Sequence, residues 1–263
     1  MNFLAREGTC GMVFMLTQAY TECMNQPVHS TKKTSPAKKK AAAKPATSKV
    51  KASTSEAPGR TNDPARTTAE ILAIATVEFA QKGLAGARID EIAERTRTSK
   101  RMIYYYFESK EGLYVKVLEH AYQRVRAIEA ELHLGDLAPE AALRRLVEFT
   151  FDHHAGNEEY IRLVMGENMN RAQYLAQSKS IQGLNVPALK AITQLYERGV
   201  LQDIFRKGLT ALDIHATISA LSFFNVANRH TFGTIFKFDP FSKAEHVKRR
   251  AHVVETVVRF LRA

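Results

Sequence analysis

From residue 62 to the end of the chain, apolar side chains recur every three or four positions, while glycine and proline are sparse. This is the spacing of residues on one face of an α-helix, and no alternating pattern long enough for a β-strand interrupts it. The pattern predicts an all-α fold of nine or ten helices. The expected helices cover residues 64–83, 89–96, 100–107, 111–132, 139–156, 158–176, 184–203, 210–232 and 243–262.

The first expected helix has clear start and stop signals. Asp63 offers a capping oxygen directly before Pro64, whose missing N–H does no harm at the first helical position. Ile71 and Phe79 belong to its predicted buried stripe, and Gly83 marks its end. The helical part of the chain is therefore expected to begin close to residue 62.

The charge of the chain is unevenly distributed. Among 263 residues, 38 lysines and arginines against 27 aspartates and glutamates give a net charge of +11, which favours nucleic acid or an acidic membrane surface as a partner. Residues 1–60 alone carry eight lysines and two arginines against three glutamates, a net charge of +7. Rich in lysine, alanine, serine, threonine and proline, much of this region is too polar to bury a core. We expect residues 1–60 to form a disordered basic arm.

The same region holds the two cysteines, Cys10 and Cys23, and a short apolar run at 11–16. Two cysteines exclude a disulfide framework and fit a reducing compartment. The run is too short for a secretion signal, and a misassigned translation start, with three later methionines as alternatives, is an equally plain explanation. No stretch reaches the roughly 18 apolar residues of a membrane span, so a cytoplasmic, nucleoid-associated protein is expected.

Two short expected helices, 89–96 and 100–107, are separated by only a few residues. The second begins with the cations Lys100 and Arg101, and Ser99 can cap it by accepting from the backbone N–H groups that follow. This is the layout of a helix-turn-helix, in which the N-terminal end of the second helix reaches the base edges of DNA. A solvated charged surface is the alternative for the two cations.

The second of these helices has a core face and a DNA face. Ile103 and Phe107, four residues apart, are expected in the core. Tyr104 is expected to pack its ring while its hydroxyl reaches a phosphate, whereas Met102 and Tyr105 are expected to be exposed toward bases. Lys110 begins a further helix, whose N–H groups can bind a phosphate. The residues expected at the DNA are Ser99, Lys100, Arg101, Met102, Tyr104, Tyr105, Tyr106 and Lys110.

These residues belong to a longer ordered series. Its members are Ile71, Leu72, Ala75, Phe79, Gly83, Ile92, Ala93, Ser99, Ile103, Tyr104, Tyr106, Phe107, Ser109, Lys110, Glu111 and Leu113. With this series, residues 64–118 resemble the DNA-binding domain of the TetR family, the tetracycline-repressor-like transcriptional regulators. The set is far more specific than a single motif. The resemblance implies a DNA-binding domain at 61–110, here called the reader, and a larger helical domain at 111–263 that dimerises and binds a ligand.

The chain departs from the family pattern at two places. Arg97 stands in the helix-turn-helix turn where the family usually has glycine, and it tolerates a left-handed backbone less well. A slight remodelling of the turn is therefore expected. Ala87 and Arg88 stand where the family usually opens its second helix with threonine or serine, which removes a neutral cap. Because the family touches phosphate there, Arg88 is expected to bind the DNA backbone.

The last helices are expected to form a homodimer interface. Apolar residues near the C-terminus recur at spacings of four, three, four and three, the seam of one helix packed on another. Small residues in the preceding helix allow close approach. The expected interface residues are Ala216, Ala220, Ala227, Val247, Ala251, Val254, Val258 and Leu261. Core packing within one subunit is the alternative.

Polar residues among apolar ones are the candidates for an effector site. With the phenylalanine and methionine residues near them, the candidates are Phe149, His153, Met165, Asn168, Phe224, Asn225, Asn228 and Arg229. The alternative for each is a satisfied polar group in the core. His153 and His154 with Glu158 and Glu159 are not expected to bind a metal, because Gly156 and Asn157 interrupt the helix between them. No cofactor is expected, and no catalytic motif suggests an enzyme.

The sequence favours a ligand-responsive transcriptional regulator, a repressor that binds a pseudo-palindromic operator as a homodimer and is released by a small molecule. The alternative is an architectural DNA-binding protein, in which the basic arm supplies general affinity and the helical domain only dimerises. A preference for one DNA site over nonspecific DNA distinguishes the two.

Overall fold

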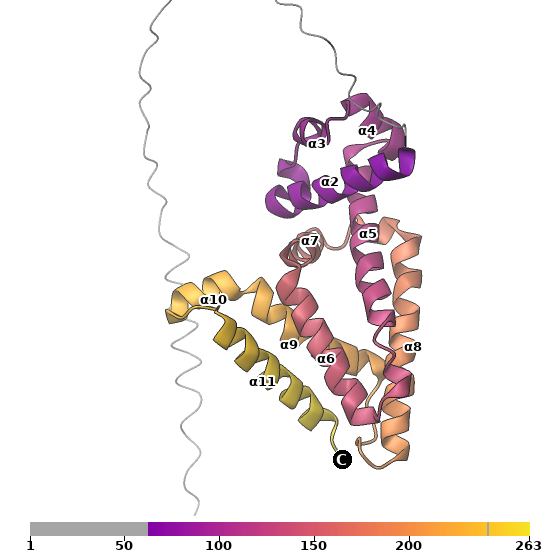
Figure 1. The fold of residues 1–263 in the computed structure, drawn as a ribbon, viewed down its shortest axis with the longest axis vertical. Coiled ribbons are helices and arrows are strands. Elements are labelled where there is room, and N and C mark those ends of the chain that lie inside the picture. The colour runs from indigo at the N-terminus through magenta and orange to yellow at the C-terminus, as the bar shows by residue number, and fades with distance from the viewer. Residues whose placement is uncertain (1–62, 241) are drawn as a thin grey trace, which may run out of the picture. The chain divides into compact units, whose positions relative to one another are not determined.

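The computed structural model describes residues 63–240 and 242–263. This part of the chain is all-α, as the helical spacing predicts, with ten α-helices, two short 3-10 helices and no β-strand (Figure 1). None of the described helices is long and apolar enough to cross a membrane. The predicted arm at 1–60, the cysteines and the apolar run lie outside the described residues. The helices are α2 (Pro64–Gly86), α3 (Ile89–Arg95), α4 (Lys100–Phe107), α5 (Lys110–Ala130), α6 (Pro139–Gly156), α7 (Glu158–Met169), α8 (Lys179–Leu201), α9 (Ala211–Ala227), α10 (Arg229–Phe236) and α11 (Lys243–Leu261).

The first described helix, α2, begins and breaks at the predicted signals. The Asp63 carboxylate accepts hydrogen bonds from the N–H groups of Ala65 and Arg66 at 3.0 and 3.1 Å. Near the other end, Gly83 leaves helical geometry with a φ of 67°, a left-handed value that glycine adopts without strain. The turn before Gly83 is therefore a helix C-terminus, where cations are favourable.

Three predicted helix boundaries are wrong. α7 ends at Met169 instead of near residue 176, because Arg171 and Ala172 take left-handed backbone angles that a helix cannot continue. α8 begins at Lys179, several residues before the predicted start. α9 and α10 replace one predicted helix and meet at Asn228. Apolar spacing located the helices but not these interruptions, which depend on single residues.

Apolar side chains form two clusters. The reader core joins α2, α3 and α4 to the first half of α5, and it also includes Leu163 of α7 and Ile181 of α8. The distal core joins α6, α9 and α11 to the second half of α8. Because α7 and α8 contribute to the reader core, the reader packs directly on the following helices.

Three residues predicted at a dimer interface belong to the distal core. Val254, Val258 and Leu261 are buried within the chain, on a helix that packs against α6 and α9. The spacing that suggested an interface between subunits is also the spacing by which a helix packs inside its own subunit. The predicted alternative, core packing, is therefore correct for these three residues.

Candidate DNA-binding surface and effector cavity

The helix-turn-helix consists of α3, a tight turn and α4. Ile92 on α3 and Ile103 and Phe107 on α4 are buried in the reader core, which confirms the predicted core face. In the turn, Arg97 takes a left-handed φ of 51°, at the position where the resemblance implies glycine. A left-handed backbone costs a residue with a Cβ about 1–2 kcal/mol, so Arg97 lowers the stability of the turn.

The N-terminal end of α4 carries three predicted DNA contacts. Ser99 Oγ accepts from the backbone N–H of Met102 at 3.2 Å, which confirms the predicted cap. Lys100 pairs with Asp90 near the start of α3, and this hydrogen bond lowers the pKa of the Asp90 carboxyl. Arg101 is exposed. Because an exposed ion pair contributes little stability, Lys100 can exchange Asp90 for a phosphate.

The tyrosines of α4 differ in exposure. Tyr105 is 77% exposed and Tyr104 is 44% exposed, which is compatible with their predicted contacts. Met102 is half-buried, which corrects the expectation that it is exposed. Tyr106 packs against the reader core, edge-on to Phe107 with ring centroids 6.3 Å apart. Tyr106 is only half-buried, so its predicted DNA contact stays a prediction.

Two further cations approach this surface from neighbouring segments. Arg88 starts α3 without a side-chain cap, as predicted, and its guanidinium is exposed. Its backbone N–H donates to Glu78 Oε1 at 3.2 Å, and Glu78, only 2% exposed, also pairs with Lys82 at 2.9 Å. Lys110 Nζ donates to the Ala85 carbonyl at 3.3 Å, so it ties α5 to the segment before α3. Sequence reasoning missed Glu78, because a lone glutamate in a helix usually faces solvent.

A second site lies among α5–α9. It is a cavity of about 210 Å³, here called the inner cavity, to which each of these five helices contributes. Aromatic rings and imidazoles form much of its wall. The lining residues are Tyr122, Val125, Arg126, Glu129, Leu146, Phe149, Thr150, His153, His154, Tyr160, Val164, Asn185, His215, Ile218, Ser219 and Phe223.

The predicted effector residues only partly coincide with the inner cavity. Phe149 and His153 line it. The six that lie elsewhere are Met165, Asn168, Phe224, Asn225, Asn228 and Arg229. Their polar groups serve other contacts: Asn225 accepts a hydrogen bond from Arg249 at 3.2 Å, and Arg229 pairs with Glu158. The presence of a polar residue on an apolar helix therefore did not predict whether that residue faces the inner cavity.

The inner cavity contains buried polar groups. Burial lowers the pKa of His153, His154 and His215, to about 4 for His154, so all three are neutral at pH 7. Arg126 and Glu129 form an ion pair with side chains 14% and 11% exposed. Burial raises the pKa of Glu129, against the lowering effect of Arg126. Arg126 Nε, His153 Nδ1 and His154 Nδ1 have no hydrogen-bond partner among the described residues.

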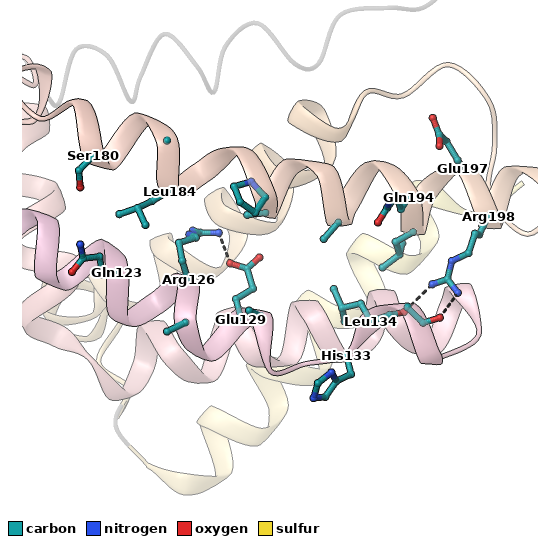
Figure 2. Close-up of a pocket in the computed structure, with 18 of the residues that line it drawn as sticks. Gln123, Arg126, Glu129, His133, Leu134, Ser180, Leu184, Gln194, Glu197 and Arg198 are labelled. Carbon is teal, nitrogen blue, oxygen red and sulfur yellow. Dashed lines mark hydrogen bonds and ion pairs between the residues drawn. The ribbon is translucent and has the colours of Figure 1, made fainter.

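A larger hollow of about 1070 Å³, here called the outer groove, lies between α5 and α8 (Figure 2). Arg126 and Glu129 line both hollows, so their ion pair lies where the inner cavity and the outer groove meet. Farther along the groove, Arg198 donates to the carbonyls of Leu134 and Gly135, each at 2.8 Å (Figure 2). Sequence reasoning missed Arg126 and Glu129, because charges three residues apart usually mark a solvated helix face.

α7 connects the inner cavity to the reader. Tyr160 and Val164 line the cavity from this helix. Between them, Arg162 donates from Nε to the Ala80 carbonyl at 2.6 Å and from Nη2 to the Gln81 carbonyl at 3.3 Å. Both carbonyls lie in the last turn of α2 before its break. One helix therefore contacts both the cavity and the reader's first helix.

The outer faces of α9 and α11 expose apolar side chains. The two helices pack side by side (Figure 1). The exposed residues are Leu212, Ala216, Ala220, Phe224, Val247 and Ala251, whereas Ala227 is half-buried. A dimer through this surface, here called the α9/α11 face, stays a prediction.

Comparison with known proteins agrees with this arrangement. The family model described as bacterial regulatory proteins, tetR family, matches residues 71–117, and the one described as tetracyclin repressor-like, C-terminal domain, matches residues 139–257. The HTH-type transcriptional repressor NicS of Pseudomonas putida KT2440 is 32% identical over 197 residues, which cover 75% of this chain and 93% of NicS.

Two further matches extend this comparison. The HTH-type transcriptional repressor SCO4008 of Streptomyces coelicolor is 35% identical over 142 residues, which cover 54% of this chain and 70% of SCO4008. The crystal structure of a tetR-family regulatory protein from Rhodococcus RHA1 has the same fold, with a TM-score of 0.59 at 22% identity, over 75% of this chain and 98% of that one. The fold joins a helix-turn-helix to a helical domain that contains a cavity. Together with these matches, it establishes that the chain belongs to the TetR family of ligand-responsive, DNA-binding transcriptional regulators.

Proposed function

We propose that the protein represses transcription as a homodimer and releases its operator when a small molecule occupies the inner cavity. The observation that carries this proposal is the double contact of α7, which lines the cavity with Tyr160 and holds α2 through Arg162. The matched relatives NicS and SCO4008, both named repressors, support the sign of regulation.

The coupling depends on a short path through α7. A ligand that displaces the Tyr160 ring shifts α7, and Arg162 transmits this shift to the last turn of α2. Glu158, at the start of α7, pairs with Arg229 and lies 3.7 Å from Arg162, so the same helix end is also connected to α10. Release requires that the ligand bind the released state more tightly than the DNA-bound state.

The α9/α11 face supports the dimer. Leu212, Phe224 and Val247 expose large apolar side chains on it, and the small Ala216, Ala220 and Ala251 permit close helix approach. A two-fold dimer can read two half-sites on successive turns of DNA. Light scattering during gel filtration is expected to give the dimer mass, and a monomer at micromolar concentration would contradict this part of the proposal.

Selection from a random pool of double-stranded DNA tests the DNA-binding part. The full chain should enrich a pseudo-palindromic site and prefer it over nonspecific DNA by roughly 10³ or more. The alternative, an architectural protein, predicts no such preference. An enriched site without two-fold symmetry would contradict the dimeric mode of reading.

Deletion of residues 1–60 separates the arm from the reader. Residues 1–60 carry a net charge of +7, so they can add phosphate contacts to those of the reader. The deletion is expected to weaken operator and nonspecific binding alike and to reduce the salt dependence of both. A changed operator preference would show that the arm reads sequence.

Arg162 tests the coupling. Arg162→Ala should leave binding of the cavity ligand within about threefold but should reduce the effect of that ligand on operator affinity, and Arg162→Lys should restore part of the effect. Arg171→Ala, an exposed residue beyond the end of α7, serves as the matched control. An unchanged ligand effect in Arg162→Ala would exclude this path.

A further inference from the structure

The inner cavity has the size and walls for one ring. Its volume is about 210 Å³, whereas a dry engineered cavity of about 150 Å³ binds benzene. Tyr160 packs edge-on against Tyr122 at 5.6 Å and stacks on His154 at 6.0 Å, and Phe149 and Phe223 complete an aromatic wall. A planar ring with a few substituent atoms fits this space, and a long acyl chain does not.

The polar groups of the cavity favour one sign of charge. Arg126 is the sole lysine or arginine among the residues that line it, and its buried Nε has no hydrogen-bond partner in the described part of the chain. A guanidinium has five donors in a planar fork, so Arg126 can bind a carboxylate through groups that Glu129 does not occupy. Glu129 also lines the outer groove, toward which it can turn when a ligand replaces it.

The histidines agree with an anionic ligand. His153, His154 and His215 are neutral, and the positive charge of Arg126 is among the causes that lower the pKa of each. Burial is the larger cause, and the neutral rings leave Arg126 as the cation among the lining residues with which an anion can pair. His153 and His154 are more than nine-tenths buried, and their Nδ1 atoms have no hydrogen-bond partner among the described residues, so a ligand group that reaches either atom would satisfy it.

We propose that the inner cavity binds a small, planar, one-ring aromatic carboxylate, whose carboxylate pairs with Arg126 in place of Glu129. This inference rests on the proposed function, in which the inner cavity is the effector site, and it adds the chemical class of the effector. The ring lies against the tyrosine, phenylalanine and imidazole walls, and the carboxylate lies at the junction with the outer groove.

Thermal unfolding and calorimetric titration of the full chain, without DNA, test this assignment. The probes are benzoate and its three monohydroxy derivatives, with benzamide, cyclohexanecarboxylate and benzylamine as controls. At a hundredfold excess over its Kd, at least one aromatic carboxylate should raise the Tm by about 5–10 °C. The uncharged, non-planar and cationic controls should bind at least tenfold more weakly.

Two variants with opposite expected effects identify the anchoring group. Arg126→Gln should weaken carboxylate binding at least tenfold, whereas Glu129→Gln, which removes the competing carboxylate, should tighten it at least threefold. Lys190→Gln, at an exposed lysine of α8 that lines neither hollow, is the matched control and should change it less than twofold. If Arg126→Gln fails to fold because Glu129 is left buried and unpaired, the double variant Arg126→Gln/Glu129→Gln removes that charge and should still bind the carboxylate at least tenfold more weakly.

Three results would overturn the assignment: no aromatic carboxylate binds with a Kd below about 10 mM, the amide binds as well as the acid, or benzylamine binds and Glu129→Gln abolishes its binding. In each case the operator selection described above decides separately whether the protein is a sequence-specific repressor. If no aromatic carboxylate binds as expected but an operator is enriched, the ligand class is rejected and the proposed function is kept. If no operator is enriched either, the proposed function is rejected as well.

Discussion

The reader core and the inner cavity are both buried, but they are built differently. Around Ile71, Ile103 and Leu113 the reader core is filled with fully buried apolar side chains. Around His153 and His154 the cavity keeps polar atoms buried without protein partners in the described structure. A buried polar group without a partner lowers the stability of the fold by about 1–3 kcal/mol, and a ligand that hydrogen-bonds to the group can remove this penalty. Packing therefore fixes the shape of the reader, whereas the hollow region stays open to a ligand.

Truncating one aromatic side chain in each region should give the largest difference between them. Phe79→Ala, in the filled reader core, is expected to lower the free energy of unfolding by about 3–5 kcal/mol, because the removed ring leaves a void. Phe223→Ala, on the cavity wall, enlarges an existing hollow and should lower it by less than half as much. Urea unfolding of both variants measures the difference, and equal losses would show that the cavity is as tightly packed as the reader.

The next effect concerns the exposed side of the reader. Arg101→Ala should weaken operator binding by about 1–3 kcal/mol, roughly fivefold to 150-fold, and leave urea unfolding unchanged, because Arg101 is exposed at the N-terminal end of α4. Arg124→Ala, remote from α4 in sequence, is the control. Unchanged operator affinity and salt slope in Arg101→Ala would mean that this end of α4 does not contact DNA.

Acidification should act on the cavity and not on the reader core. His154 has a folded pKa of about 4, below the ordinary value of 6.5, so the unfolded chain binds more protons between these values. Stability is therefore fully present above pH 6.5 and is lost as the pH falls toward 4, by about 2 kcal/mol for His154 between pH 7 and pH 5. Urea unfolding at both pH values should show this loss, and His154→Asn should reduce it. A pH slope unaffected by His154→Asn would place the titration elsewhere.

The smallest expected effect is a gain in the reader. Arg97→Gly replaces a left-handed residue that has a Cβ, so it should raise the free energy of unfolding by about 0.5–1 kcal/mol after the entropy of the added glycine is considered. Arg95→Gly, in the last turn of α3 with no such backbone angle, is the control and should be destabilising. A destabilising Arg97→Gly would show that the Arg97 side chain contributes more than its backbone strain removes.

Sequence reasoning succeeded where local rules determine position. The core face of α4 and the cap at Ser99 follow from spacing and capping chemistry. At Arg97 a slight remodelling of the turn was expected, and Arg97 itself takes a left-handed φ of 51°. The interior of the helical domain depends on how five helices rotate against one another, which spacing alone does not determine. For this reason Val254 was expected at an interface and lies in the distal core.

The cavity shows the same limit. Phe149 and His153 were identified because a polar residue lies among aromatic ones, but six other candidates point elsewhere. Arg126 and Glu129, which divide the inner cavity from the outer groove, gave no distinctive signal, since the same pair is common on exposed helices. A buried ion pair becomes visible only when the packing around it is known.

Coupling between the inner cavity and the reader is tested most directly by titrating the enriched operator with the full chain, with and without a saturating ligand of the inner cavity. The ligand is expected to weaken operator binding at least tenfold, to leave nonspecific binding within about threefold, and to be bound more weakly by the same factor when operator is present. A ligand that binds the inner cavity while operator affinity stays unchanged would contradict the coupling of cavity and reader through α7.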